Sequence, residues 1–400
     1  MASLLTVEQA QALVLARVPI PEVELVPLGA ADGRVTAAGS RAAVDLPPFA
    51  SSAMDGFAVR AADLPGTLAV VGSSAAGRPA AGALGAGEAI EISTGAVVPA
   101  GADAVVPVEY VVHRDNSVEI AEPVEPGAHV RPRGGDTARG DTIVSAGVRL
   151  GPVQLGALAA VGVAEVECGR RPRVAILATG SELVAPGAAL AAGQIYESNG
   201  LMLAAALAAA GADIELQPAV ADDEPAHRAA LERALTADVL VTSGGVSVGP
   251  HDLVRRVEAE LGVEEVFWRV AVKPGKPVSF AVRGSTLVFG LPGNPVSSLV
   301  ASELFVKPAL RAFQGAADPL PRLEAGRLAS ALRRNDARDA YVRARARVDP
   351  DGTVLEPLSG QESHMIARAA AADALVHVPM GAGSLEAGAP VSWIRLGAAG

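Results

Sequence analysis

The sequence has few aromatic residues, one cysteine and no long apolar run. Aromatic residues make up 3% of the 400 residues although half are hydrophobic, so alanine, valine and leucine must form most of the core. The lone Cys168 excludes an internal disulfide and a cysteine-rich metal site, and we expect it to pack as a small apolar side chain. The longest apolar run, Leu201–Ala210, is shorter than the ~20 residues of a membrane-spanning helix.

Positive charge is also scarce. The chain has 33 basic and 44 acidic residues and a net charge of −11, which argues against nucleic acid or an acidic membrane as a partner of the whole molecule. An anionic small molecule would need a local basic pocket or a metal ion. The start of the chain also lacks a basic segment followed by an apolar one, so we expect a soluble, cytoplasmic protein.

The pattern changes several times along the chain, which predicts several domains. The spacing of Thr6 and Gln9 is that of a capping box, so a helix should begin there. Short β-branched runs over residues 60–130 predict a small β domain. Residues 173–315 alternate strand and helix patterns, which is typical of an α/β domain with a mostly parallel sheet. From about residue 320 strand patterns return, predicting a C-terminal β domain.

Three predicted strands each end in a loop that contains glycine. Val174–Ala178 leads into Thr179–Glu182, Val239–Val241 into a loop with Gly244, Gly245 and Gly249, and Leu287–Phe289 into Gly290–Pro295. In open parallel sheets the loops at the carboxyl ends of the strands form the ligand crevice. Such loops can also be simple tight turns. No Gly-Lys-Ser/Thr follows, so the loop after Val241 is not a P-loop.

Other charged residues have both a functional and a structural interpretation. Lys273–Pro277 places two lysines on a loop framed by proline and glycine, which favours an anion clamp over freely solvated lysines. Asp55 precedes Gly56 and could form a hairpin turn. Asp222 and Asp223 precede a predicted helix and could be its N-caps.

Nine motifs in order resemble one known family, the molybdopterin molybdenumtransferases or MoeA family, which is related to the C-terminal domain of gephyrin. They lie at Ser52–Phe57, Ser93–Ala96, Gly101–Val105, Arg133–Asp136, Thr179–Leu183, Gly193–Tyr196, Thr242–Gly249, Lys273–Pro277 and Gly290–Ser297. The resemblance extends over essentially the whole chain.

The resemblance implies both an architecture and a reaction. Molybdenum from molybdate is inserted into adenylated molybdopterin and AMP is released, with Mg²⁺ as the cofactor. The implied parts are a discontinuous N-terminal helical or linker domain (residues 1–46 plus 140–170), an inserted β domain (47–139), an α/β molybdopterin-binding domain (171–319) and a C-terminal β domain (320–400). The implied assembly is a homodimer with a shared active site, and a molybdopterin adenylyltransferase is the expected pathway partner.

The resemblance also assigns site residues by their positions in the motifs. The implied catalytic acids are Asp55, Asp136, Glu182, Asp222 and Asp252, and all of these except Asp136 are the implied metal ligands. The residues implied in substrate binding are Thr94, Ser243, Gly244, Gly245, Ser247, Gly249, Lys273, Lys276, Pro292, Asn294, Ser297, Arg343 and Ser363. Lysines and an arginine suit a small oxyanion such as molybdate.

Two alternative functions stay open at this point. A molybdopterin adenylyltransferase shares a domain like residues 173–315, but the remaining chain and the motifs around Asp55 and Asp136 disfavour it. A gephyrin-like scaffold is disfavoured because the chain has no long linker and no second fused domain.

Overall fold

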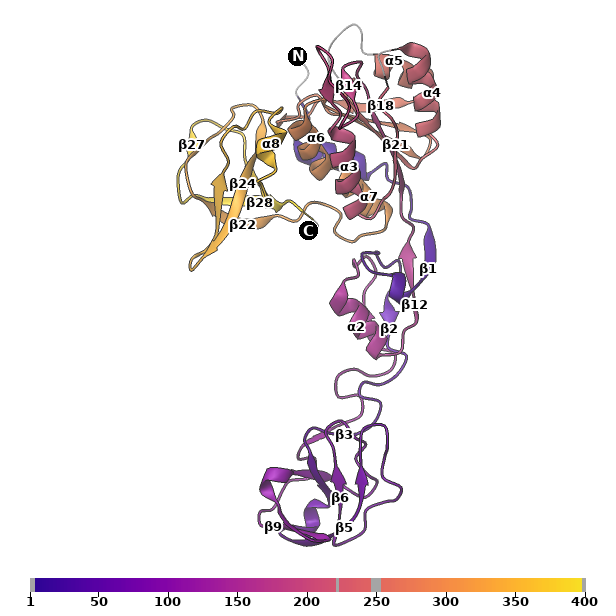
Figure 1. Cartoon of the computed structure of the whole chain (residues 1–400), viewed down its shortest axis with the longest axis vertical. Helices are drawn as coiled ribbons and strands as arrows, with labels where there is room; N and C mark the ends of the chain where they lie inside the picture. The colour runs from indigo at the N-terminus through magenta and orange to yellow at the C-terminus, as the bar shows by residue number, and fades with distance from the viewer. Residues whose placement is uncertain (1–3, 221–222, 246–252, 398–400) are drawn as a thin grey trace.

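The molecule is elongated, with an α/β part and a C-terminal β part at one end and a separate β part at the other (Figure 1). The computed structural model describes residues 4–220, 223–245 and 253–397. Within these ranges, every helix is too short or too polar to traverse a lipid bilayer. The separate parts of the molecule agree with the multidomain organisation expected from the sequence.

Six strands form the central sheet of the α/β part. In spatial order they are β16 (Asp213–Leu216), β13 (Arg173–Ala178), β17 (Val239–Ser243), β21 (Thr286–Leu291), β20 (Ser279–Arg283) and β18 (Glu264–Trp268). The first four run parallel, whereas β20 and β18 are antiparallel to their neighbours. The sheet is thus mixed, and its first four strands are parallel as predicted. Every residue of β17 and β21 is buried, because helices cover both faces.

The alternation of side chains along β13 shows how the two faces are covered. Val174 and Ile176 pack in one apolar cluster with helix α3 (Asn199–Ala209) and with the continuous helical segment α6 (Pro295–Ala301), η4 (Ser302–Val306) and α7 (Lys307–Phe313). Ala175 and Leu177 pack in a second cluster with α4 (Glu224–Ala234) and α5 (Leu253–Glu260). Each fully buried valine, leucine or isoleucine contributes about 1.5–3 kcal/mol to folding.

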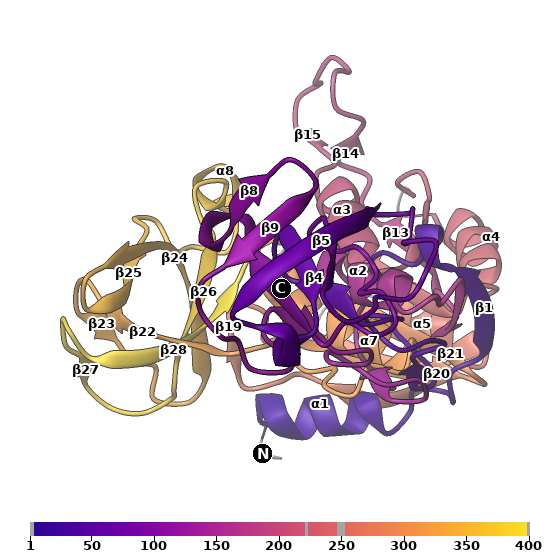
Figure 2. The same ribbon diagram turned by 90° about the horizontal axis from the view of Figure 1, so that it is seen from below.

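Helix α1 (Val7–Leu15) begins at the predicted capping box, in which the Gln9 N–H donates to Thr6 Oγ1 and the Thr6 N–H to Gln9 Oε1. Its apolar stripe of Val7, Ala10 and Val14 belongs to the same cluster as α7. Figure 2 shows α1 along the outer edge of the α/β part. Burial of this stripe holds α1 on the α/β core, and the grouping of residues 1–46 with 140–170 stays a prediction.

A narrow middle part joins the two ends of the molecule. It contains β1 (Val23–Pro27), η1 (Leu28–Ala30), β2 (Ser40–Arg41), β11 (Thr142–Val144), α2 (Pro152–Ala160) and β12 (Glu165–Gly169). The pairings β1–β12 and β2–β11 bring residues before and after the inserted β part together. Cys168 is buried in the small core of this part, as expected for an apolar side chain.

The β part at the far end is built on a six-stranded sheet. Its order is β7 (Ala104–Pro107), β4 (Gly56–Val59), β6 (Glu88–Ile92), β5 (Gly66–Ser74), β9 (Ser117–Ile120) and β8 (Val112–Arg114). The smaller elements are β3 (Ser51–Ser52), which pairs with β10 (Val130–Arg131), and the 3₁₀ turns η2 (Ala61–Asp63) and η3 (Val108–Tyr110). The structure therefore contains the small β domain that the short β-branched runs predict.

The C-terminal part is a barrel that closes because β24 pairs with both β25 and β26. Its strands are β22 (Glu324–Leu328), β24 (Asp339–Asp349), β25 (Gly352–Pro357), β26 (Ala374–Val378) and β28 (Pro390–Arg395), with β23 (Leu332–Arg333), β27 (Ser384–Leu385) and helix α8 (Ile366–Ala369) beside them. Strand β19 (Val272–Lys273), which leads out of the α/β part, adds to β24 in parallel. This pairing fixes the barrel against the end of the sheet where the predicted lysine loop begins.

Candidate active site

A large cavity lies at the carboxyl ends of β13, β17 and β21, where the sequence predicted a crevice. It encloses about 750 Å³. The loops after the three strands supply the predicted site residues Glu182, Ser243, Gly244, Gly245, Pro292 and Asn294 to its lining. The segment with β14 (Leu183–Val184) and β15 (Ile195–Tyr196) borders the cavity and projects from the body of the molecule (Figure 2). The volume lies within the range of small-molecule sites.

The loop after β17 needs its glycines. Gly244 and Gly245 have φ angles of +97° and +66°, which side-chain-bearing residues rarely adopt. A Cβ on Gly244 would lie 2.8 Å from the carbonyl oxygen of Thr179, and one on Gly245 would overlap Val254. The two glycines therefore allow this loop to pack closely against Thr179 and Val254, and both line the cavity. The neighbouring predictions at Ser247, Gly249 and Asp252 lie outside the described residues, as does Asp222.

Asn199 connects the loops after β17 and β21 by hydrogen bonds, and the family motifs did not identify it as a site residue. Its side-chain Nδ2 donates to Ser243 Oγ at 2.8 Å and to the carbonyl oxygen of Gly293 at 2.7 Å. The residue is buried and lines the cavity, and its Oδ1 has no hydrogen-bond partner in the described part of the chain. An asparagine next to the serine before a predicted helix reads as a capping residue, so only the packing reveals this role.

His227 is a second cavity-lining residue that the sequence did not single out. Its side chain is buried, and neither ring nitrogen has a hydrogen-bond partner among the described residues. It lies on α4, where its position follows the helical spacing of Ala230 and Leu231, both buried against the sheet. From the sequence, His227 looks like one more residue of the buried face of α4. Only the fold shows that its imidazole lines the cavity.

The lysine loop packs beside the cavity and over the start of α6. Lys273 and Lys276 are exposed, and neither forms an ion pair with a described residue. A Cβ on Gly275 would lie 3.4 Å from the carbonyl oxygen of Ser297, so the loop lies directly on α6. On the same helix, the N–H of Val296 donates to the carbonyl oxygen of Ser363 at 3.0 Å. The fold thus brings the lysine loop, Ser297 and Ser363 together, and Pro277 and His364 extend this group to the cavity.

Arg343 is placed differently from an anion-binding arginine. Its side chain is fully buried, and it donates to the carbonyl oxygens of Met365, Gly360 and Glu362 at 2.8, 2.7 and 3.2 Å. Burial lowers the pKa of this guanidinium. These donors hold the loop that carries Ser363, and the substrate contact that the resemblance implies for Arg343 stays a prediction.

Three predicted residues lie away from the cavity within one chain. Asp55 and Thr94 are in the far β part, where the Thr94 N–H donates to the Asp55 carboxylate at 2.7 Å. Asp136 is exposed in a loop, and its own backbone N–H donates to the carbonyl oxygen of Leu46 at 2.9 Å. A single chain therefore does not bring these acids to Glu182.

Carboxylates that could bind a metal are sparse in the described part of the chain, where no group of three or more potential ligands lies close together. At the cavity, Glu182 is exposed, whereas the Glu197 carboxylate accepts a hydrogen bond from the Gly200 N–H at 2.7 Å and so caps α3. Glu182 is thus the better placed of these two oxygen ligands.

Comparison with known proteins identifies the relatives of this chain. Family models match residues 5–162 (MoeA N-terminal region, domain I and II), 175–312 (probable molybdopterin binding domain) and 325–396 (MoeA C-terminal region, domain IV). Molybdopterin molybdenumtransferase 2 of Mycobacterium tuberculosis is 39% identical over 88% of this chain and 90% of its own length. The Haemophilus influenzae molybdopterin molybdenumtransferase is 39% identical over 78% of each chain.

The chain belongs to the MoeA family of molybdopterin molybdenumtransferases. Two crystal structures of molybdopterin biosynthesis MoeA proteins from Pyrococcus horikoshii share its fold. One has a TM-score of 0.84 at 27% identity over 98% of this chain and all of the other; the second has 0.81 at 34% identity over 98% and 99%. The resemblance seen in the nine motifs is confirmed, and so is the enzyme class, a transferase of molybdenum cofactor biosynthesis.

As a MoeA family member, the chain differs from the adenylyltransferase alternative raised by its sequence. Its match to named molybdopterin molybdenumtransferases includes the far β part and the barrel, in addition to the α/β part that an adenylyltransferase would share. No structural observation favours the scaffold alternative.

Proposed function

We propose that this chain inserts molybdenum from molybdate into adenylated molybdopterin and releases AMP. The observation that carries the proposal is the cavity at the carboxyl ends of β13, β17 and β21, which has glycine backbone on one side and the lysine loop beside it. A cavity of this kind fits a substrate with both a ring system and phosphate groups. The cytoplasmic location expected from the sequence is part of the same proposal.

The roles proposed for the residues follow from their chemistry. The half-buried Gly244 and Gly245 line the cavity, and backbone N–H groups at such turns bind anions such as a phosphate. Lys273 and Lys276 supply positive charge for molybdate or the pterin phosphate in a chain of net charge −11. Asn199 holds the loops after β17 and β21 in register, so that both contact the same substrate.

Magnesium fits the oxygen ligand that the described cavity offers. Glu182 presents an exposed carboxylate, and Mg²⁺ keeps several waters, so one or two carboxylates suffice to hold it. We propose Glu182 as one ligand, with Asp222, Asp252 and the partner chain's equivalent of Asp55 as further candidates. The chemistry that the ion supplies when bound is charge neutralisation at the phosphates.

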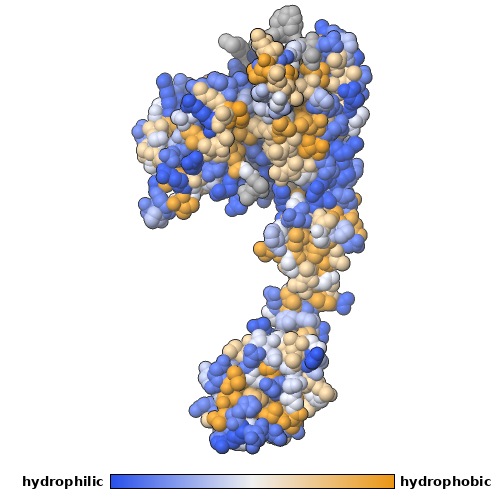
Figure 3. All heavy atoms as spheres, viewed as in Figure 1, coloured by the Kyte–Doolittle hydropathy of each residue, from blue (hydrophilic) through white to orange (hydrophobic). Residues whose placement is uncertain are grey.

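We propose a homodimer in which the far β part of one subunit completes the cavity of the other. Asp55, Thr94 and Asp136 match the family site but lie away from their own chain's cavity. Apolar side chains are exposed over the narrow middle part in Figure 3, and those of this part include Leu25 on β1 and Val153 on α2, with 60% and 79% of their surface exposed. Such exposure supports an interface. A molybdopterin adenylyltransferase would supply the adenylated substrate.

The direct test is AMP release from adenylated molybdopterin in four mixtures, with molybdate and magnesium each present or absent. We expect rapid AMP release only when both are present, because magnesium neutralises the charge of the phosphates and molybdate is the oxyanion that displaces AMP. Fast release with magnesium alone would make the protein a pterin-adenylate hydrolase. Release of pyrophosphate from ATP and molybdopterin would instead support the adenylyltransferase alternative.

A further inference from the structure

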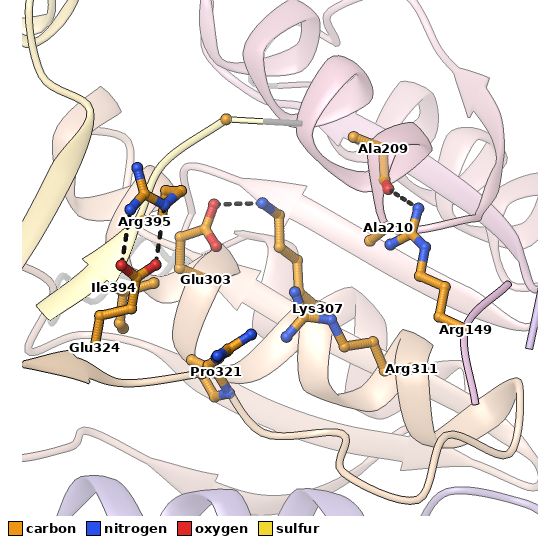
Figure 4. Close-up of a pocket in the computed structure, with 12 residues that line it drawn as sticks. Arg149, Ala209, Ala210, Glu303, Lys307, Arg311, Pro321, Glu324, Ile394 and Arg395 are labelled. Atoms are coloured by element: carbon orange, nitrogen blue, oxygen red, sulfur yellow. Dashed lines mark hydrogen bonds and ion pairs between the residues drawn. The ribbon is translucent and has the colours of Figure 1, made fainter. Parts of the chain in front are cut away.

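A second cavity lies at the C-terminal end of α3, whereas the N-terminal end of that helix lines the candidate active site. It encloses about 210 Å³. Its lining comes from the middle part through Arg149, from α7 through Lys307 and Arg311, and from the start and end of the barrel segment through Arg322 and Arg395 (Figure 4). The cavity is smaller than the usual site of a drug-sized ligand.

The lining is strongly basic in an acidic protein. Five cationic side chains face two carboxylates, Glu303 and Glu324, although the whole chain has a net charge of −11. Both carboxylates are already paired. Lys307 Nζ donates to Glu303 at 2.5 Å, and Arg395 donates to both oxygens of Glu324 at 2.9 and 2.7 Å.

Three guanidinium groups are therefore left without a carboxylate partner among the described residues: Arg149, Arg311 and Arg322. Arg149 donates to the carbonyl oxygen of Ala209 at 2.9 Å, which directs it to the end of α3 beside the cavity (Figure 4). Arg311 makes one long contact, 3.4 Å, to the carbonyl oxygen of Leu320. Burial lowers the pKa of Arg311. The nearby Glu303 carboxylate opposes this shift, and a smaller repulsion from Arg149 adds to it, so the two arginines are close enough to interact.

We propose that this cavity binds a tetrahedral oxyanion of two or more charges, of the inorganic phosphate class, at a site separate from the candidate active site. Such an anion relieves the repulsion between the arginines and accepts hydrogen bonds from guanidinium groups, which match its geometry. Because Arg149, Arg311 and Arg322 come from three different parts of the chain, the bound anion also stabilises their packing against one another.

The test is calorimetric titration of inorganic phosphate into the full-length double variant Lys273→Ala/Lys276→Ala, so that binding at the lysine loop does not contribute. We expect this variant to bind phosphate, with chloride at equal ionic strength as the reference. Adding Arg322→Gln, an exposed residue whose loss leaves the core intact, should weaken phosphate binding at least tenfold, and Arg311→Gln should do the same. Arg347→Gln, which removes an exposed arginine paired with Glu356 elsewhere, should leave it within twofold.

Two outcomes would overturn the proposal. One is the absence of phosphate binding in the Lys273→Ala/Lys276→Ala variant, which would place all binding at the lysine loop. The other is an affinity that neither Arg311→Gln nor Arg322→Gln changes. Failure of AMP release in the experiment on the candidate active site leaves this result unaffected, because phosphate binding is measured without turnover. Titrations with sulfate and molybdate then define which oxyanion binds best.

Discussion

The side-chain amide of Asn199 lies 2.8 Å from Ser243 Oγ and donates a hydrogen bond to it. Since the same nitrogen also donates to the carbonyl oxygen of Gly293, one buried group at the start of α3 fixes the loops after two neighbouring strands. Several consequences for stability and activity can be measured.

Replacing Asn199 should loosen the cavity. Asn199→Ala leaves the Gly293 carbonyl without this donor, and a buried group left unpaired costs about 1–3 kcal/mol. We expect a decrease of that size in the free energy of unfolding by urea, together with slower AMP release. Asn116→Ala, at an exposed turn, is the control. Equal free energies of unfolding for the two variants would show that the Asn199 hydrogen bonds do not stabilise the fold.

Arg343 should matter for stability more than for molybdate use. Arg343→Lys retains a charge but cannot donate to three carbonyl oxygens in the same planar geometry, so we expect it to lose about 1.5–3 kcal/mol of stability. Arg345→Lys is a matched control, because Arg345 lies two residues further along the same strand and is exposed. Unchanged stability with a higher molybdate requirement would restore the substrate-binding role that the resemblance assigns to Arg343.

Lys276→Ala should weaken the use of molybdate. Losing a cation from a hydrogen-bonded anion site costs roughly 1.5–3 kcal/mol, and ~1.4 kcal/mol corresponds to one decade. The molybdate concentration needed for half-maximal AMP release should therefore rise about ten- to a hundredfold. The exposed Arg283→Ala at the other end of β20 is the control. An unchanged molybdate requirement with poorer retention of pterin would assign Lys276 to the pterin phosphate.

Subunit mixing tests the shared site. Asp55→Ala and Glu182→Ala should each be inactive, because the first damages the far β part and the second the cavity. Mixed dimers contain one intact site, so exchange between equal amounts should restore about a quarter of wild-type activity, half of the dimers being mixed. The measurement is AMP release after exchange verified by mass spectrometry. No recovery would place Asp55 outside the site.

Asp238 should make stability depend on acid pH. Burial alone would raise the pKa of this carboxyl, but hydrogen bonds from Arg170 and from the Arg173 N–H outweigh burial and lower it. A lowered folded-state pKa stabilises the protein above the unfolded value of about 3.9, and that stability is lost as the pH falls through the folded value. Wild type should therefore lose more stability between pH 5 and 3 than Asp238→Asn. The measurement is the free energy of unfolding of both proteins against pH, and parallel curves would contradict the role given to Asp238.

The sequence by itself determined the types of the main elements and where their ligand-binding ends lie. Thr6 and Gln9 form the predicted capping box, and the apolar runs of β13, β17 and β21 end in the predicted polar loops, because capping and side-chain alternation depend on residues only a few positions apart. The family motifs could be read for the same reason, since each is a short contiguous stretch.

Contacts between distant segments were decided only by the tertiary structure. The apolar stripe of α1 required a partner, but nothing local specified α7 in place of the middle part. Period-two alternation placed Arg343, Arg345 and Arg347 on one face of β24, yet the first is buried and the other two are exposed. The loop of residues 360–365 folds over one end of that face and supplies the carbonyl oxygens for Arg343. Burial depends on what covers a residue, and the covering segment lies elsewhere in the chain.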